Sequence, residues 1–208
     1  MIRVVVIKEG VKNRELRGKI VHREPVSSSV TLIRTNVNII VDTACRGDAN
    51  IILEGLSAQG LEPYDVDYVI NTHWHPDHTS NNHLFSKARI IIGESTWMPG
   101  VNTNHGSWED EVDGMDGVRI IRTPGHVPEH ISVIAESDRR YVMAGDAFYE
   151  KDLREGGVPK TNSSIGKFKE SALRILEEAD VIIPGHGRVI ELDEESRKEF
   201  IRLVHGLG

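Results

Sequence analysis

The stretch 71–82, NTHWHPDHTSNN, concentrates side chains that bind metal ions. Six consecutive positions carry three histidines and an aspartate: His73, His75, Asp77 and His78. Imidazole and carboxylate groups suit Zn²⁺ and related divalent ions. Pro76 stiffens the turn and so lowers the entropy cost of holding these side chains in place. A chance group of surface histidines is the alternative, and the density of ligand types makes it improbable. The stretch therefore predicts a metal site.

The spacing within this stretch predicts two sites rather than one. In an extended loop the side chains of His73 and His75 point to the same side. Asp77 and His78 follow where we expect the chain to bend, with His78 opening a helix, so they can point to a neighbouring spot. One loop can thus supply two ligands to each of two metal ions. The remaining ligands must come from elsewhere in the chain.

Three more ligand-type residues each follow an apolar run and a glycine. RIIRTPGH delivers His126, YVMAGD delivers Asp146, and VIIPGHG delivers His186. A single histidine after a strand is more often structural, but three ligands in the same position relative to a strand are not independent accidents. We therefore expect them at one edge of the sheets, beside the first cluster. Asp146 is the expected bridge, because a carboxylate offers one oxygen to each of two metals.

Runs of β-branched residues predict the strands that position these groups. In the first half we expect strands at 2–7, 18–22, 30–35, 37–42 and 66–71, with a hairpin turn at Thr35-Asn36. The apolar spacing of 48–60 predicts a helix that begins near Asp48 and ends near Gly60. In the second half we expect strands at 88–93, 117–125, 130–136, 139–146 and 180–185, and helices at 166–178 and from about Asp193. The irregular stretch 94–116 is long enough to be a functional cover or binding loop.

The composition is that of an ordinary globular chain. Its 208 residues are 38% hydrophobic and 27% charged, and we expect them to form a single α/β domain, 1–208, with two sheet-like halves. The net charge of −7 does not favour nucleic acid as a partner, and no apolar run approaches a membrane span. The lone cysteine predicts a cytoplasmic location, and the scarcity of glutamine and cysteine favours a thermophilic source.

Together these motifs resemble one known superfamily. HWHPDH is similar to the H-x-H-x-D-H signature of the metallo-β-lactamase-fold hydrolases, and TPGH, GD and PGHG resemble their later ligand motifs. The resemblance covers about 37–189 and implies an αββα sandwich of two mixed β-sheets flanked by helices. It also implies the ligand sets: His73, His75 and His126 for one metal, Asp77, His78 and His186 for the second, and Asp146 as the bridge.

The resemblance extends to residues around the ligands. Asp42 matches an acidic residue that supports the ligands from behind. The family's usual Thr-Gly is Thr43-Ala44-Cys45 here, so Cys45 either lies near the site or is a small structural thiol. His130 matches a supporting histidine, whereas His83 and His105 are not expected as ligands, although His105 can line the site. An apolar wall is expected from three tryptophans: Trp74, Trp97 and Trp108.

The implied reaction is hydrolysis with two divalent ions per chain. Zn²⁺ is the expected metal, and Fe or Mn also fit the ligand set. A metal-bound water or hydroxide would attack an ester, lactone or thioester carbonyl of a small substrate, so no serine or cysteine nucleophile is needed. We expect Asp77, Asp146 and Tyr149 to act in catalysis. GDAFYE places Tyr149 as in the N-acyl homoserine lactone lactonases, where a tyrosine assists the carbonyl oxygen; a packing role is the alternative.

Other activities stay open on the sequence alone. A compact phosphodiesterase or nuclease would need a phosphate-facing basic patch, for which the chain offers Lys160, Lys167, Lys169 and Arg174, but their helical spacing argues more for an ordinary solvated helix face. Mono-iron sulfur dioxygenases share the H-x-H pattern. A non-catalytic metal-binding protein is the least expected, because a structural site is normally closed by fewer ligands. The 22 residues after His186 are too few for the helical extension of glyoxalase II-type thioesterases. A homodimer is plausible.

Overall fold

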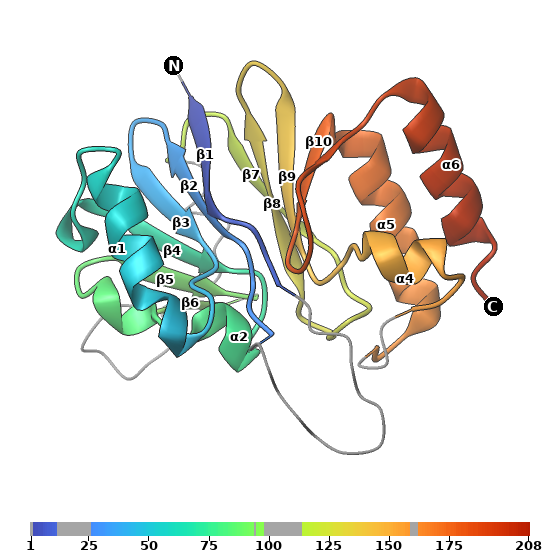
Figure 1. Ribbon diagram of the computed structural model, residues 1–208, viewed down its shortest axis with the longest axis horizontal. Helices are drawn as coiled ribbons and strands as arrows, with labels where there is room; N and C mark the ends of the chain where they lie inside the picture. Colours follow the sequence, from blue (N-terminus) through green and yellow to red (C-terminus); the bar gives the residue numbers. More distant parts are fainter. Residues whose placement is uncertain (1, 12–25, 94, 98–113, 159–161) are drawn as a thin grey trace.

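Two β-sheets lie face to face between helices in the computed structural model of the chain (Figure 1). The structure describes residues 2–11, 26–93, 95–97, 114–158 and 162–208. Helices cover the outer face of each sheet, so the layers run helix, sheet, sheet, helix. The expected αββα sandwich of two mixed sheets is therefore confirmed.

The first sheet contains the strands of the amino-terminal half. Its order is β1 (Arg3–Lys8), β2 (Val30–Arg34), β3 (Asn38–Val41), β4 (Tyr68–Asn71), β5 (Arg89–Ile92) and β6 (Ser95–Trp97). The expected hairpin joins β2 to β3 in antiparallel register. β3, β4 and β5 are parallel, so their carboxyl ends share one edge of the sheet.

The second sheet contains the strands of the carboxyl-terminal half. Its order is β11 (Ile190–Glu191), β10 (Val181–Pro184), β9 (Arg140–Gly145), β8 (Ile131–Glu136) and β7 (Val118–Arg122). β9 and β10 are parallel, and β7 runs in the same direction because both β7 and β9 are antiparallel to β8. The three strands that precede His126, Asp146 and His186 therefore end at one edge.

Helices follow the strands in both halves of the chain. They are α1 (Ala49–Ser57), α2 (Pro76–Thr79), α4 (Glu150–Arg154), α5 (Ile165–Glu178) and α6 (Glu194–His205), with short 3₁₀ turns at Arg46–Asp48, Pro63–Asp65 and Asn82–Leu84. The Ser164 side chain caps α5, and Asp193 with Ser196 forms a capping box at α6.

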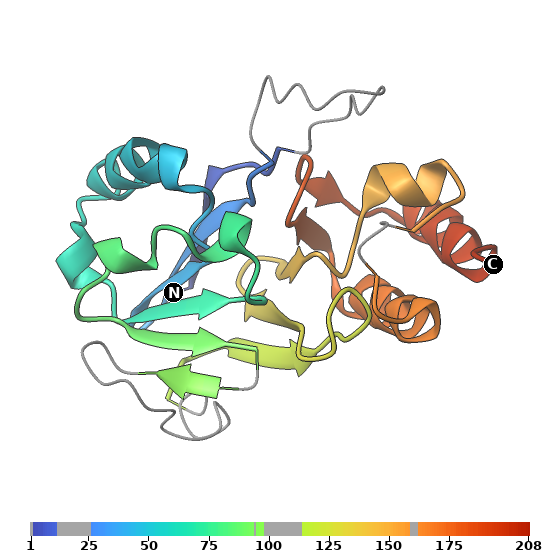
Figure 2. The same cartoon turned by 90° about the horizontal axis from the view of Figure 1, so that it is seen from below.

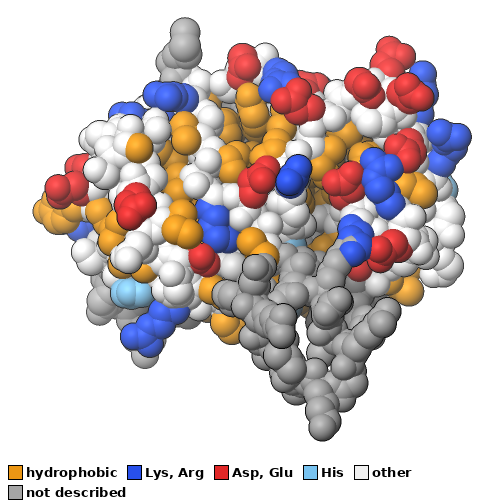
Figure 3. All heavy atoms as spheres, viewed as in Figure 1, with side chains coloured by type: hydrophobic (Ala, Val, Ile, Leu, Met, Phe, Trp, Pro, Cys, Tyr) orange, Lys and Arg blue, Asp and Glu red, His pale blue; other side chains and the backbone are white. Residues whose placement is uncertain are grey.

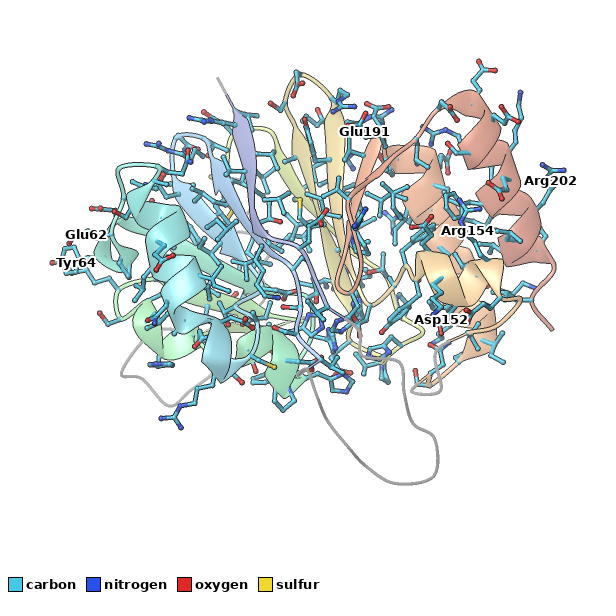
Figure 4. All side chains as sticks on the ribbon, in the orientation of Figure 1. Glu62, Tyr64, Asp152, Arg154, Glu191 and Arg202 are labelled. Atoms are coloured by element: carbon cyan, nitrogen blue, oxygen red, sulfur yellow. The ribbon has the colours of Figure 1, made fainter. Side chains whose placement is uncertain are left out.

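Arg154 of α4 points toward α6, where it donates to Glu199 and lies over the Phe200 ring (Figure 4).

Alternation along the strands builds three apolar layers. In β3, Ile39 and Val41 face the other sheet while Ile40 faces α1. In β10, Ile183 faces the first sheet while Ile182 packs toward α5 and α6. Because successive strand residues point to opposite faces, strands with two buried faces appear as continuous apolar runs.

Several expected boundaries differ from the observed ones. β7 ends at Arg122 rather than at Gly125, and the chain bends at 125–127. The helix of the histidine loop begins at Pro76 rather than at His78, since proline is favoured at the first helical position. The stretch 94–116 is not wholly irregular, because β6 pairs with β5. The helix α4 was not expected. The expected strand 18–22 lies outside the described residues.

In the described part of the chain, none of the helices has both the length and the apolarity that crossing a membrane requires.

We expect Phe200→Ala to destabilise the protein strongly. Phe200 is fully buried, and its ring packs edge-on against Phe148, with 5.3 Å between the ring centroids. The cavity left behind should lower the free energy of unfolding by about 3–5 kcal/mol. The neighbouring Ile201 is only partly buried, so Ile201→Ala serves as the control. Urea denaturation that shows equal losses for both variants would contradict this account of how α6 packs.

Candidate dinuclear metal centre

The seven expected ligands meet at the edge where the ligand-bearing strands end. They form two groups, and the ligand atoms within each group lie within 4.8 Å of one another. The first group is His73, His75, His126 and Asp146; the second is Asp77, His78 and His186. Figure 2 looks at the molecule from this edge and shows the loop after β7 beside the start of α5. The structure thus brings together side chains up to 113 positions apart, from His73 to His186.

In the first group, nitrogen atoms from three histidines face a common point. His75 Nδ1 lies 2.8 Å from His73 Nε2 and 3.0 Å from His126 Nε2. Asp146 Oδ2 is 3.3 Å from His126 Nε2 and 4.0 Å from His73 Nε2. One carboxylate oxygen therefore completes this group.

The second group takes the other oxygen of the same carboxylate. His78 Nε2 and His186 Nε2 are 3.4 Å apart, and His186 Nε2 is 3.2 Å from Asp77 Oδ2. Asp146 Oδ1 lies 3.3 Å from His78 Nε2 and 3.5 Å from His186 Nε2. Asp146 is thus placed between the two groups, with one oxygen toward each.

The orientation of the imidazoles fits a pair of cations. His78 Nδ1 is 2.8 Å from Asp42 Oδ2, and His186 Nδ1 is 3.2 Å from the backbone oxygens of Val11 and Ser27. These acceptors hold the proton on Nδ1 and leave the Nε2 lone pairs directed inward. Asp146 Oδ1 is buried and has no hydrogen-bond partner. A metal ion would complement both features, because it accepts the converging nitrogen lone pairs and binds the unpartnered carboxylate oxygen.

Asp42 supports the centre from behind, at the carboxyl end of β3. Its Oδ1 accepts the backbone N–H of Thr72 at 2.8 Å, and its Oδ2 accepts the Thr72 hydroxyl at 3.0 Å. The same hydroxyl lies 3.1 Å from His73 Nδ1, so it can accept that imidazole proton. Asp42 thus orients His73 through Thr72 and His78 directly. The sequence did not single out Thr72; its signal was a polar residue between the end of a strand and the first histidine.

His130 holds the backbone that carries Asp146. The Asp146 N–H donates to His130 Nε2 at 3.1 Å, so the imidazole proton is on Nδ1, which lies 2.9 Å from Thr123 Oγ1. The Thr123 hydroxyl is 2.8 Å from Ser132 Oγ, which donates to the Ala144 oxygen. All three supporting side chains are buried. The chain of hydrogen bonds begins and ends within β9 and the residue after it, and it places His130 where a supporting role was expected.

Two glycines are needed where the loops approach most closely. Gly145 has φ +51, and a Cβ there would lie 2.6 Å from Thr72 Oγ1. A Cβ on Gly185 would lie 2.2 Å from Asp146 Oδ1. A side chain at Gly145 would therefore clash with Thr72 of the first sheet, and one at Gly185 would displace the Asp146 carboxylate.

Burial and charge shift the titration of these groups in the metal-free protein. Burial holds the pKa of His73 well below its usual value and lowers the pKa of His126 to about 4. Although burial opposes it, the carboxylates of Asp42 and Asp146 raise the pKa of His78. Burial likewise opposes the shift at Asp146, but the neighbouring His78 and His186 lower its pKa. The centre therefore combines an anionic carboxylate with two imidazoles, His73 and His126, that resist protonation and one, His78, that favours it.

Tyr149 lies at the centre, with its hydroxyl donating to Asp146 Oδ2. Its ring stacks on His186 at 6.3 Å and lies 6.1 Å from His126, both between centroids. Burial, followed by the charge of Asp146, raises the pKa of the phenol well above its usual value. The phenol therefore keeps its proton at neutral pH.

The remaining expected residues lie at varied distances from the centre. Cys45 is half-buried, and its thiol donates to the Val26 oxygen. Trp74 is 48% exposed. His83 is exposed, contacts the Ser80 oxygen and belongs to neither group. His105, Trp108 and the Trp97 side chain lie outside the described residues.

The basic side chains that a phosphodiesterase or nuclease would need do not converge on the centre. Lys169 contacts the backbone oxygens of His205 and Leu207 at the end of α6, and Arg174 contacts the Arg122 oxygen. Lys167 is exposed on the first turn of α5, and Lys160 lies outside the described residues. The described cations therefore belong to a solvated helix face.

A separate hollow of about 800 Å³ lies at the other end of the sandwich, where β1 approaches the β8–β9 turn. It is lined by Ile2, Arg3, Val4, Glu136, Ser137 and Asp138. Figure 3 shows hydrophobic side chains gathered on this face. None of the expected ligands lines it.

We expect His73→Ala and His126→Ala each to lower the metal content from about two ions per chain to about one. Each change removes an imidazole from the first group, and affinity depends on the full ligand set. His83→Ala removes an exposed histidine and is the matched control. The measurement is elemental analysis of dialysed protein. Full metal content in both variants would exclude the first group as a metal site.

His130→Gln should flatten the pH dependence of stability in the metal-free protein. Burial lowers the pKa of His130 from 6.5 to about 3. Below pH 6.5 the His130 imidazole therefore binds a proton in the unfolded chain but not in the folded chain. The free energy of unfolding consequently falls as the pH falls toward 3. This contribution is at most roughly 1.4 kcal/mol per pH unit, and the variant lacks it. Urea denaturation between pH 7 and 5 that gives equal slopes for both proteins would contradict the shift.

Comparisons with known proteins agree with this geometry. Residues 23–97 match the family described as the metallo-beta-lactamase superfamily. Metallo-beta-lactamase domain-containing protein 1 of Xenopus laevis is 35% identical over 179 residues, covering 82% of this chain and 76% of the relative. A probable metallo-hydrolase of Methanocaldococcus jannaschii is 36% identical, covering 73% of this chain and 72% of the relative. An N-acyl homoserine lactonase of a Bacillus species is 28% identical, covering 65% of this chain and 61% of the relative.

Solved structures share the fold. A metallo-β-lactamase-type protein of Thermotoga maritima superposes with a TM-score of 0.63 at 19% identity, over 92% of this chain and 99% of that one. A quorum-quenching N-acyl homoserine lactone lactonase gives a TM-score of 0.55 at 23% identity, over 76% and 79% of the two chains. With the motifs, the sandwich and the two ligand groups in place, the chain belongs to the metallo-β-lactamase superfamily of metallo-hydrolases.

Proposed function

We propose that this metallo-hydrolase uses two metal ions to hydrolyse an ester, lactone or thioester bond in a small substrate. The observation that carries the proposal is the position of Asp146, with one oxygen toward each of two ligand groups. All seven ligand atoms are nitrogens or carboxylate oxygens, which favours Zn²⁺ and also admits Fe or Mn. When bound, such a pair of ions supplies an activated water and polarises the carbonyl.

The protein's own groups hold and orient the reacting atoms. Asp42, Val11 and Ser27 fix the proton on Nδ1 of the second-group imidazoles, and His130 fixes the peptide of Asp146. Asp77, whose pKa is lowered by its hydrogen bond with His186 against the effect of burial, stays ionised beside the second group. These contacts preorganise the site before substrate arrives, so little reorganisation is needed during the reaction.

Tyr149 is the proposed donor to the carbonyl oxygen. Its phenol is protonated at neutral pH and lies against Asp146, between the two ligand groups. A hydroxyl there can shift its hydrogen bond from the carboxylate to the oxygen on which negative charge develops.

Apolar side chains around the centre favour an acyl substrate. Trp74, inside the histidine loop, and Ile165, at the start of α5, are 48% and 41% exposed. Val11 and Val26 are each 37% exposed; the Val11 backbone oxygen contacts His186, and Val26 precedes Ser27, whose backbone oxygen contacts the same ring nitrogen. Exposed apolar groups beside a polar centre are typical of sites for small molecules. The lactonase relative, whose name specifies an N-acyl lactone, supports the same class of substrate.

Tyr149→Phe tests both the reaction and the role of the phenol. The variant should keep its metal content and hydrolyse lactones and p-nitrophenyl esters roughly 10–1,000-fold more slowly, because one donor to the developing oxyanion is lost. Bis-p-nitrophenyl phosphate, if hydrolysed at all, should be affected far less.

The melting temperature and the wild-type rates separate the alternatives. If Tyr149 only packs, the substitution should lower the free energy of unfolding by about 1 kcal/mol and leave the rates of acyl hydrolysis unchanged. Acyl hydrolysis at the wild-type rate in a fully metallated variant would remove Tyr149 from the mechanism. A metallated wild-type protein that cleaves only the phosphodiester would overturn the acyl-hydrolase proposal itself.

A further inference from the structure

Asp48 stands at the start of α1, yet its carboxylate does not cap the helix. Aspartate is favoured at this position because its side chain accepts a backbone N–H of the first turn. Here none of the described N–H groups at the start of α1 donates to it. Instead Asp48 Oδ2 accepts the hydroxyl of Ser27 at 2.5 Å, and Lys8 Nζ lies 3.9 Å away. The Asp48 side chain is only 15% exposed. It therefore serves the contact with Ser27 rather than the helix.

The Ser27 hydroxyl joins Asp48 to the backbone that faces His186. Ser27 is buried, and its hydroxyl also accepts the N–H of Cys45 at 3.0 Å. Ser27 and Val11 exchange backbone hydrogen bonds in both directions, at 2.7 Å and 2.9 Å. The carbonyl oxygens of this pair are the two that lie 3.2 Å from His186 Nδ1. Holding Ser27 in place therefore holds both acceptors of that imidazole.

The residues that follow Ser27 contact the rest of the second ligand group. The Ser28 N–H donates to the Asp77 oxygen at 3.0 Å, and the Ser29 N–H donates to the Gly185 oxygen at 2.8 Å. Lys8 Nζ donates to the Ser28 oxygen at 3.0 Å and so fastens the same segment. The segment 27–29 thus contacts the backbone of one ligand and of the residue before another. All of these contacts fall on the second group.

We propose that Asp48 and the Ser27 hydroxyl are positioning groups for the second metal ion, whose affinity they raise by fixing the direction of His186. The inference rests on the two-metal function proposed above and concerns its second group alone. Groups that orient a histidine ligand from behind typically contribute about 10–100-fold to metal affinity. Asp48 acts through a serine and a backbone carbonyl rather than on the imidazole itself. We therefore expect the lower end of that range.

Metal affinity in two backgrounds tests the proposal. His73→Ala should leave one ion bound by the second group, and His186→Ala should leave one ion bound by the first group. Competition for Co²⁺ with a chromophoric chelator gives the Kd of the remaining ion. Adding Ser27→Ala should raise this Kd by about tenfold in the His73→Ala protein and leave it unchanged in the His186→Ala protein. Equal changes in the two backgrounds, or no change in either, would overturn the proposal.

Ser28→Ala is the matched control in the His73→Ala protein. Ser28 is also buried, but its hydroxyl donates to the Ser29 oxygen at 3.0 Å. Its loss should lower the melting temperature, as Ser27→Ala does, and leave the Kd for Co²⁺ unchanged. Asp48→Ala should raise the Kd, whereas Asp48→Asn, which keeps an acceptor oxygen for the Ser27 hydroxyl, should not. Equal losses of affinity in the two serine variants, or in the two Asp48 variants, would overturn the proposal.

Amide hydrogen exchange in the metal-free protein separates this inference from the two-metal function. The N–H groups of Val11 and Ser29 donate to the Ser27 and Gly185 oxygens. They should exchange faster in Ser27→Ala than in the wild-type protein or in Ser28→Ala, because the segment is no longer held by Asp48. A wild-type protein that binds fewer than two ions would overturn the two-metal function, and the exchange rates would still decide whether Ser27 holds the segment. Unchanged exchange in Ser27→Ala would overturn the positioning role.

Discussion

The structure depends on one buried carboxylate, Asp146, held where the edges of two sheets meet. Five ligand-type histidines surround the two acidic side chains of the centre, and their nitrogens lie as little as 2.8 Å apart. Neutral imidazoles at that distance can share an N–H···N hydrogen bond, but the inward Asp146 Oδ1 has no hydrogen-bond partner. Two cations would complement this arrangement, because each would accept lone pairs from side chains of both sheets. The fold is therefore compatible with a dinuclear metal site.

Holding that carboxylate requires both sheets to approach closely at one edge. Gly145 and Gly185 permit the contact, since a side chain on either would clash with Thr72 or with Asp146 itself. The apolar layer between the sheets, with Ile70 and Ile183 among its members, fixes their separation. Asp42 from the first sheet and His130 from the second then orient opposite sides of the centre. The hydrophobic core positions the strands, and the polar supports position the ligands.

Tyr149 follows the end of β9 and donates its hydroxyl to Asp146. In the proposed reaction this hydrogen bond must be exchanged for one to the substrate oxygen, so the phenol is a group that responds to developing charge.

The sequence by itself determined the fold class and predicted the candidate ligands. HWHPDH, TPGH, GD and PGHG are local motifs that each follow an apolar run, so the expectation that His73, Asp146 and His186 emerge at one edge came from the motifs and from the family that they resemble. Boundaries such as the start of α2 at Pro76 were missed by a residue or two, because turn geometry competes with apolar periodicity. Only the tertiary structure decided which donor meets which acceptor: the carbonyls of Val11 and Ser27 at His186, the phenol of Tyr149 on Asp146, and the exposure of Trp74. Those contacts join segments far apart in the chain, and no local pattern encodes the direction of a side chain across the gap between two sheets.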